Sequence, residues 1–152
     1  MGRNGLVALV DSQDADLVVA HTWRPQIVRG GEITYARTTI EESTLTMHVL
    51  VMGKPWVDHI NHNGLDNRRV NLRPSSRSQN GANRRKLGTF SSLYKGVTWN
   101  KMARKWKATV TRDKRQRHLG YFTDEIAAAR AYDSAAVELF GEYAQLNFPN
   151  KS

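Results

Sequence analysis

Asp58 and His59 stand side by side at the end of an apolar run and open an unusually polar stretch that continues to residue 80. Five asparagines follow them in this stretch, Asn61, Asn63, Asn67, Asn71 and Asn80. Carboxylate and amide oxygens are the ligands that a hard divalent cation such as Mg²⁺ prefers, and such cations pair naturally with phosphate. A neighbouring imidazole could take a proton from an attacking water. The residue types therefore favour metal-assisted hydrolysis of a phosphate ester.

The same residues resemble the HNH nuclease family, in its phage and intron homing-endonuclease branch. Asp58 and His59 match the family's Asp-His pair, Asn71 matches its middle Asn, and Asn80 matches its last metal ligand. The resemblance implies that Asp58 and Asn80 hold the metal, that His59 is the general base, and that Asn71 fixes the loop that aims His59. Many relatives have His where this chain has Asn80, so the variant favours Mg²⁺ or Mn²⁺ over zinc.

The residues before this stretch fit the family less completely. The segment 47–50 is similar to the family's lead-in strand, but Val49 stands where this branch usually has a basic residue after the His. One phosphate contact is therefore missing from the expected pattern.

Two other interpretations of the stretch stay open at the level of sequence. Asn, Gly and Asp are common in turns because their side chains bond the local backbone, so the stretch could be a loop and no more. Alternatively, His48, His59 and His62 could form a trio of metal ligands, although a histidine without a defined partner is more often structural or solvated.

Composition limits the class of protein. The chain of 152 residues is long enough for one ordinary domain or two small ones. It has no cysteine, which excludes disulfides and thiolate zinc sites. Neither a membrane-spanning run nor a signal-peptide pattern is present, so we expect a cytoplasmic, nucleoid-associated protein with no membrane partner.

The positive charge is concentrated in one part of the chain. Residues 1–57 carry 5 Lys or Arg against 6 Asp or Glu, whereas residues 68–117 carry 16 Lys or Arg and one acidic residue, Asp113. Trp99 and Trp106 lie within this basic block. Such a block indicates a nucleic-acid-binding surface, and a solvated charged surface is the alternative.

Hydrophobic patterning predicts an α+β fold that begins with a structural preamble over residues 1–43. We expect a strand at 6–10, a short helix from Ser12 to Ala20, and a hairpin whose strands run from 26 to 29 and from 33 to 40 around Gly30-Gly31. A nuclease module over residues 44–86 follows. Its predicted elements are a strand over 44–52, a strand entering Asp58, a strand at Leu72-Arg73 and a helix over 74–85 begun by Ser75 or Ser76, which is the ββα-metal arrangement that the resemblance implies.

A linker at residues 87–92 precedes a second predicted domain over residues 93–149. Residues 105–111 alternate between polar and apolar types, as in a strand with two different faces. Segments 94–99 and 115–119 are its predicted partners. Thr123 could cap the helix that follows, alanines and Tyr132 form its apolar face, and Gly141 ends it.

This second part resembles the Apetala-type DNA-binding domain of plant ethylene-response factors. The similarity lies in segments 94–97 and 119–122, in 127–133 and in Leu146-Asn147-Phe148-Pro149. The resemblance implies a three-stranded antiparallel sheet that enters the major groove, with one α-helix packed behind it. The plant reading residues are replaced here, so DNA binding carries over and the plant target sequence does not.

Together the two resemblances predict a metal-dependent DNA endonuclease, of a phage or mobile-element homing type, whose second domain locates the site on double-stranded DNA. The expected phosphate contacts are Arg68, Arg69, Arg73, Arg77, Lys95, Lys105, Lys107 and Arg117, and the expected base-reading residues are Thr98, Asn100, Thr109, Thr111, Gln116 and His118. One metal site per chain favours a monomer that nicks. The alternatives are a catalytically inactive DNA-binding regulator and an RNA-binding protein.

Overall fold

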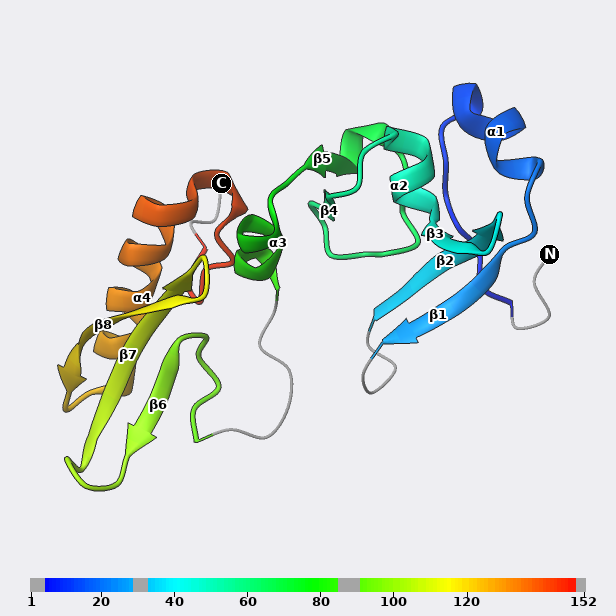
Figure 1. Ribbon diagram of the computed structural model, residues 1–152. Helices are drawn as coiled ribbons and strands as arrows, with labels where there is room; N and C mark the ends of the chain where they lie inside the picture. Colours follow the sequence, from blue (N-terminus) through cyan, green and yellow to red (C-terminus); the bar gives the residue numbers. More distant parts are fainter. Residues whose placement is uncertain (1–4, 29–32, 85–90, 150–152) are drawn as a thin grey trace. The chain divides into compact units, whose positions relative to one another are not determined.

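The computed structural model describes residues 5–28, 33–84 and 91–149, and Figure 1 shows their elements in chain order. Contacts divide the chain into two units, Met1–Ser76 and Arg77–Ser152, each with its own core. The fold class is α+β, as predicted. The turn of the predicted N-terminal hairpin and residues 87–90 of the predicted linker lie outside the described residues.

The first unit contains two small antiparallel sheets. One sheet has the strand order β1-β2-β3 and the other pairs β4 with β5. The elements of this unit are η1 (Ser12–Asp14), α1 (Ala15–Val19), β1 (Arg24–Val28), β2 (Ile33–Ile40), β3 (Ser43–Thr46), α2 (Met47–Met52), β4 (Val57–His59), η3 (Arg69–Asn71) and β5 (Leu72–Pro74). The core gathers one or two apolar residues from most of them: Val18, Ala36, Met47, Val51, Val57 and Leu72.

The predicted strand over residues 44–52 is wrong in its second half. Strand β3 stops at Thr46 and the chain turns into helix α2, which Gly53 ends in the left-handed conformation with φ 61°. Met47 and Val51 are both buried in the core. Their i, i+4 spacing puts them on one face of a helix, so packing overrides the β preference of the valines.

The N-terminal elements are also shorter than predicted. In place of a strand over residues 6–10, only Leu9 forms a β-bridge, with Asp66. Ser12 starts a 3-10 turn instead of capping an α-helix. Asp14 is buried because its carboxylate accepts two hydrogen bonds from the Arg69 guanidinium, at 2.9 and 2.7 Å. This ion pair ties the N-terminal helix to η3.

The second unit packs one long helix on a three-stranded antiparallel sheet, as predicted. The sheet has the order β6-β7-β8, and the unit's elements are α3 (Arg77–Asn83), β6 (Val97–Asn100), β7 (Lys105–Arg112), β8 (Arg115–Phe122), α4 (Glu125–Phe140) and η4 (Gly141–Tyr143). The buried side chains of α4 that face the sheet are mostly small, namely Ala128, Ala129, Ala135 and Ala136. Small side chains let the helix backbone approach the sheet closely.

Two details of this unit differ from the prediction. The cap of α4 is Asp124, whose carboxylate accepts a hydrogen bond from the Ala127 amide at 2.8 Å, and not Thr123. Helix α3 was assigned to the nuclease module that ends at residue 86, but the contacts group it with the second unit. The reason is that Ala82 is buried in the same core cluster as Val110, Tyr132 and Phe140.

The C-terminal segment is fixed to the unit by a polar network. The Asp133 carboxylate accepts hydrogen bonds from the backbone amides of Asn147 and Phe148, both at 2.9 Å. The Asn147 side chain in turn bonds the backbone of Lys95, accepting from its amide and donating to its carbonyl. These contacts explain why Asp133 and Asn147 belong to the motif that the sequence displays.

Gly96 sets the distance between β6 and α4 and gives a test of this packing. Its φ is +75°, and a Cβ added to it would lie 2.0 Å from Cδ2 of Tyr132. Gly96→Ala should therefore lower the free energy of unfolding by about 1–3 kcal/mol, measured by urea denaturation.

Gly81→Ala is the matched control for Gly96→Ala. Gly81 lies in helix α3 with no atom within 4 Å of an added Cβ, so the change should raise stability by up to about 1 kcal/mol. A Gly96→Ala protein as stable as the wild type would contradict the packing of Tyr132 on β6.

Candidate functional site

His59 is the last residue of β4, and its ring is enclosed by side chains from three other segments. It lies 4.7 Å from the His48 ring on α2 and 5.7 Å from the Tyr35 ring on β2, measured between centroids. Its Nε2 is 3.4 Å from Oδ1 of Asn67, a fully buried residue. The sequence placed only His59 in this site and gave His48 no more than an alternative role.

Burial keeps both imidazoles neutral. Desolvation lowers the pKa of His59 below its usual value, against the opposing effects of Asn67, Asp58 and Asp66. Desolvation and the nearby His59 lower the pKa of His48 to about 3. A neutral imidazole can accept a proton, so the pKa of His59 suits the role of a base at neutral pH.

Asp58 is buried beside His59, and its carboxylate faces a guanidinium. Arg73 is its Cα partner on β5, and Arg73 Nε and Nη2 donate to Asp58 Oδ2 at 3.1 and 3.0 Å. Arg73 was predicted to hold a flanking phosphate. The structure instead shows it balancing a carboxylate that is only 5% exposed.

The loop between β4 and β5 is held by its own side chains. Asn71 accepts a hydrogen bond from the Asn61 amide at 2.9 Å and donates one to the Asp66 carbonyl at 2.7 Å. Arg68 binds both oxygens of Asp66 at 2.8 Å, and this ion pair lowers the pKa of Asp66 to about 2. The loop therefore carries Asn67 to the His59 ring in a defined position.

Gly64 allows this loop to lie against Tyr35. A Cβ added at Gly64 would stand 2.6 Å from both the Thr34 carbonyl oxygen and the Tyr35 ring. Glycine is needed here for close approach. Tyr35 thus contacts the loop and the His59 ring, although neither its type nor its position in the hairpin pattern had indicated this.

The metal ligands that were predicted lie in different units. Asp58 belongs to the first unit and Asn80, on α3, to the second, so their pairing stays a prediction from the sequence. Within the described ranges, no group of three His, Cys, Asp or Glu side chains is placed to hold a metal ion. The trio of His48, His59 and His62 is therefore not assembled.

The free face of the C-terminal sheet carries all six predicted base-reading residues. Residues paired across antiparallel strands share a face, and the register pairs Thr98 with Lys107, Asn100 with Lys105, Thr109 with His118, and Thr111 with Gln116. The buried residues Val97, Ala108 and Val110 occupy the opposite face, under α4. The alternation predicted for residues 105–111 is confirmed, and it gathers two lysines and six polar residues on one surface.

Two predicted phosphate contacts lie elsewhere. Arg117 pairs in register with Val110 and donates a hydrogen bond to Glu138 on α4 at 3.2 Å. The register shifts at the bulge between Ala108 and Thr109, and this shift places Arg117 on the face of β8 that is turned toward the helix. Lys95 is half-buried and its ammonium donates to the carbonyls of Ala82 and Arg84 at the end of α3. Burial, with Arg84 nearby, lowers the pKa of Lys95 to about 8.

The remaining predicted phosphate contacts fall into two groups. Arg68 and Arg69 are ion-paired with Asp66 and Asp14, so their charges are balanced within the first unit. Arg77 is exposed at the start of α3, and its role stays a prediction. No helix within the described ranges is long and apolar enough to cross a membrane.

Comparison with known proteins finds similarity to two different groups. The chain is 36% identical, over 109 residues, to a protein of Acanthamoeba polyphaga mimivirus named as an uncharacterized HNH endonuclease; the match covers 71% of this chain and 54% of the viral protein. It is 42% identical over 71 residues to an AP2-like ethylene-responsive transcription factor of Arabidopsis thaliana, covering 39% of this chain and 23% of that protein. It is 41% identical over 58 residues to APETALA2-like protein 2 of Oryza sativa subsp. indica, covering 38% of this chain.

These similarities are partial. The chain spans about half the length of the viral relative, under a quarter of the Arabidopsis factor and 13% of the rice protein. No family model matches the chain, and no solved structure shows significant similarity to it. The sequence is thus distantly similar to an HNH endonuclease and to plant AP2-type factors.

The half-buried His48 gives a test of the site at acid pH. His48 binds a proton in the unfolded chain below about pH 6.5, but in the folded protein only near its lowered pKa of about 3. The unfolded state therefore binds more protons between these values, and the free energy of unfolding should fall as pH falls, by up to about 1.4 kcal/mol per pH unit for one proton.

His48→Gln is the variant that isolates this effect. Urea denaturation of both proteins between pH 7 and pH 4 should show a smaller loss of stability in His48→Gln, because carboxylate titration is common to both. Parallel losses would mean that His48 is not buried in its neutral form.

Proposed function

We propose that this protein is a metal-dependent DNA endonuclease of the HNH type that hydrolyses a phosphodiester bond at a position set by its C-terminal sheet. The observation that carries the proposal is the neutral, oriented His59 imidazole at the end of β4, next to the Asp58 carboxylate. The similarity to the viral HNH protein supports it from an independent direction.

His59 is the proposed general base. When Nε2 donates its proton to Asn67 Oδ1, the lone pair lies on Nδ1, which can accept a proton from water. The water oxygen forms a bond to phosphorus while the bond from phosphorus to the 3′ oxygen breaks, and the 3′ oxygen then takes up a proton. Asn71 acts through the loop, as a positioning residue that holds Asn67 against the ring.

Asp58 and Asn80 are the proposed metal ligands, for Mg²⁺ or Mn²⁺. Their carboxylate and amide oxygens fit a hard cation, and no thiolate is available in the chain to favour zinc. When bound, such a cation would stabilise negative charge on the phosphate and the leaving oxygen. Without a cation, Arg73 is the ion-pair partner of Asp58, with its Nη2 3.0 Å from Asp58 Oδ2.

A division of labour between the two units supports the choice of duplex DNA as the substrate. Contacts to a scissile phosphate carry no sequence information, so a separate surface has to read the bases. The free sheet face offers hydroxyl, amide and imidazole groups with two lysines, which are groups suited to a DNA groove. The similarity to AP2-type transcription factors also supports DNA as the partner.

One observation favours a rival function, a catalytically inactive DNA-binding protein. The Asp58 carboxylate is hydrogen-bonded to Arg73, and His59 is only 6% exposed. Both features would be expected if these residues had lost their catalytic role and now only stabilise the fold. The rival predicts DNA binding without cleavage under any metal condition.

Cleavage of supercoiled plasmid separates the two functions. The wild type should nick plasmid with Mg²⁺ or Mn²⁺ and leave it intact with EDTA. His59→Ala should lose about two to four decades of rate, the usual contribution of a general base, while its DNA affinity is unchanged.

His62→Asn is the control for a change near the site. His62 lies on the same loop with φ +64°, a conformation that Asn tolerates, so this variant should cut like the wild type. Full activity in His59→Ala would remove His59 as the base, and an intact plasmid with every divalent cation would favour the regulator.

The sheet face is tested by the salt dependence of binding. Replacing Lys105 and Lys107 with Ala should reduce the slope of log affinity against log salt by about 1.8, since each lost phosphate contact is worth about 0.9. Arg117→Ala removes a charge that Glu138 balances on the other face, and it should leave the slope nearly unchanged. Equal slopes for the double lysine variant and the wild type would mean that DNA does not bind on this sheet face. Tighter binding to duplex RNA than to duplex DNA would favour the RNA-binding alternative.

A further inference from the structure

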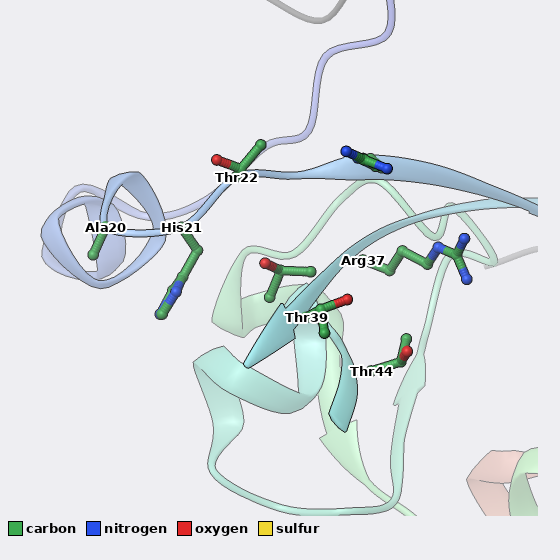
Figure 2. Close-up of a pocket in the computed structure, with 8 residues that line it drawn as sticks. Ala20, His21, Thr22, Arg37, Thr39 and Thr44 are labelled. Carbon is green, nitrogen blue, oxygen red and sulfur yellow. The ribbon is translucent and has the colours of Figure 1, made fainter. Parts of the chain in front are cut away.

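A polar pocket of about 510 Å³ lies on the N-terminal sheet, in a part of the chain whose sequence indicated only a structural role. It is lined by residues of β1, β2, β3 and the segment before β1. In Figure 2, Thr22 lies on the segment that leads into β1, and Arg37, Thr39 and Thr44 lie on β2 and β3. Arg24, on β1, also lines the pocket.

The two arginines of the pocket face each other across the sheet. Arg24 and Arg37 are direct Cα partners on β1 and β2, and both are exposed. Like charges directly opposite on neighbouring strands destabilise a sheet. Within the described ranges no carboxylate is ion-paired with either guanidinium. This pair contrasts with Arg68, Arg69 and Arg73 of the same unit, each of which has a carboxylate partner.

The other groups in the pocket suit an anion with several oxygens. Thr39 and Thr44 are also direct partners, on β2 and β3, and together with Thr22 they add hydroxyl groups, which can donate hydrogen bonds, to the lining of the pocket. A guanidinium presents a planar fork of donors that matches a phosphate group. The chemistry of the pocket is therefore that of a phosphate site.

Strand β2 contributes both to the pocket, through Arg37 and Thr39, and to the surroundings of His59, through Tyr35. Alternation in a strand puts residues 35, 37 and 39 on one face, and the buried core residue Ala36 faces the other way. Tyr35 contacts the His59 ring, so Arg37 lies about 7 Å along the strand from the residue that touches the proposed base. The DNA backbone winds around the helix axis as it rises, so this distance is close to the separation between neighbouring phosphates of one strand.

We propose that Arg24 and Arg37 bind a backbone phosphate of the DNA strand being cut, next to the scissile phosphate, and so set the position of that strand at His59. The position of this phosphate relative to a scissile bond at His59 rests on the proposed nuclease function. The binding of phosphate by the pocket does not, because it is measured without cleavage.

The experiment measures binding of a fluorescent DNA duplex to the full-length protein over a range of NaCl concentrations. Arg24→Gln with Arg37→Gln should reduce the log–log salt slope by about 0.9, because one phosphate is no longer neutralised. Arg24→Lys with Arg37→Lys keeps both charges and should keep the slope. Lys54→Gln removes an exposed charge of the same unit outside the pocket and should also leave the slope unchanged.

The double Gln variant should be at least as stable as the wild type, because it removes a like-charge pair, so a folding defect would itself count against the proposal.

Two outcomes would overturn the proposal. If the double Gln variant has the wild-type salt slope, the pocket does not hold DNA phosphate. If sodium phosphate raises the melting temperature of the wild type more than NaCl at equal ionic strength, while the DNA slope is unaffected by the double Gln change, the pocket takes free phosphate instead. If the wild type binds DNA but never cuts it, the nuclease proposal is wrong. The salt slopes would still show whether Arg24 and Arg37 bind DNA phosphate.

Discussion

The first unit depends on the hydrogen bonds and ion pairs that its buried polar residues make with one another. Asp14, Asp58, His59, Asp66, Asn67 and Asn71 are all buried, in a unit whose apolar core is small. A buried polar group without a hydrogen bond destabilises the folded state by more free energy than most single apolar contacts contribute to its stability. The loop from β4 to β5 avoids this destabilisation through Asn71, which joins Asn61 to Asp66, and through Arg68, which neutralises Asp66. The same hydrogen bonds that stabilise the loop also orient the His59 ring.

The distribution of charge follows from the same requirement. The basic block looks uniform in sequence, yet several of its cations are used inside the fold. Arg68, Arg69 and Arg73 balance buried carboxylates, and Lys95 binds the end of α3. The lysines at 105 and 107 stand instead on the free sheet face, and Arg24 and Arg37 form a like-charge pair in a region with a net negative charge. A count of charges along the chain therefore does not show which cations are available to a partner.

The two units solve different physical problems. In the first unit the sheets are small, and buried polar residues hold one imidazole, His59, and one carboxylate, Asp58, in place. The second unit uses an alanine-rich helix to cover one face of a sheet and leaves the other face polar. Polar groups on a rigid sheet can read base edges, whereas a single buried imidazole cannot. This separation is the physical basis for assigning recognition and chemistry to different parts of the chain.

The sequence by itself determined the elements whose signals are local. The period-2 alternation of residues 105–111 and the helix ending at Gly141 were predictable because each depends on neighbouring residues. The pairing of β4 with β5 was expected from the family resemblance. Tertiary structure alone decided the rest. Residues 47–52 form a helix because Met47 and Val51 must reach one core, Tyr35 and His48 join His59 from segments 11 to 24 residues away, and Arg117 is turned to the helix side by a bulge. Such contacts depend on which surfaces meet in space, and a pattern of residue types along the chain does not contain that information.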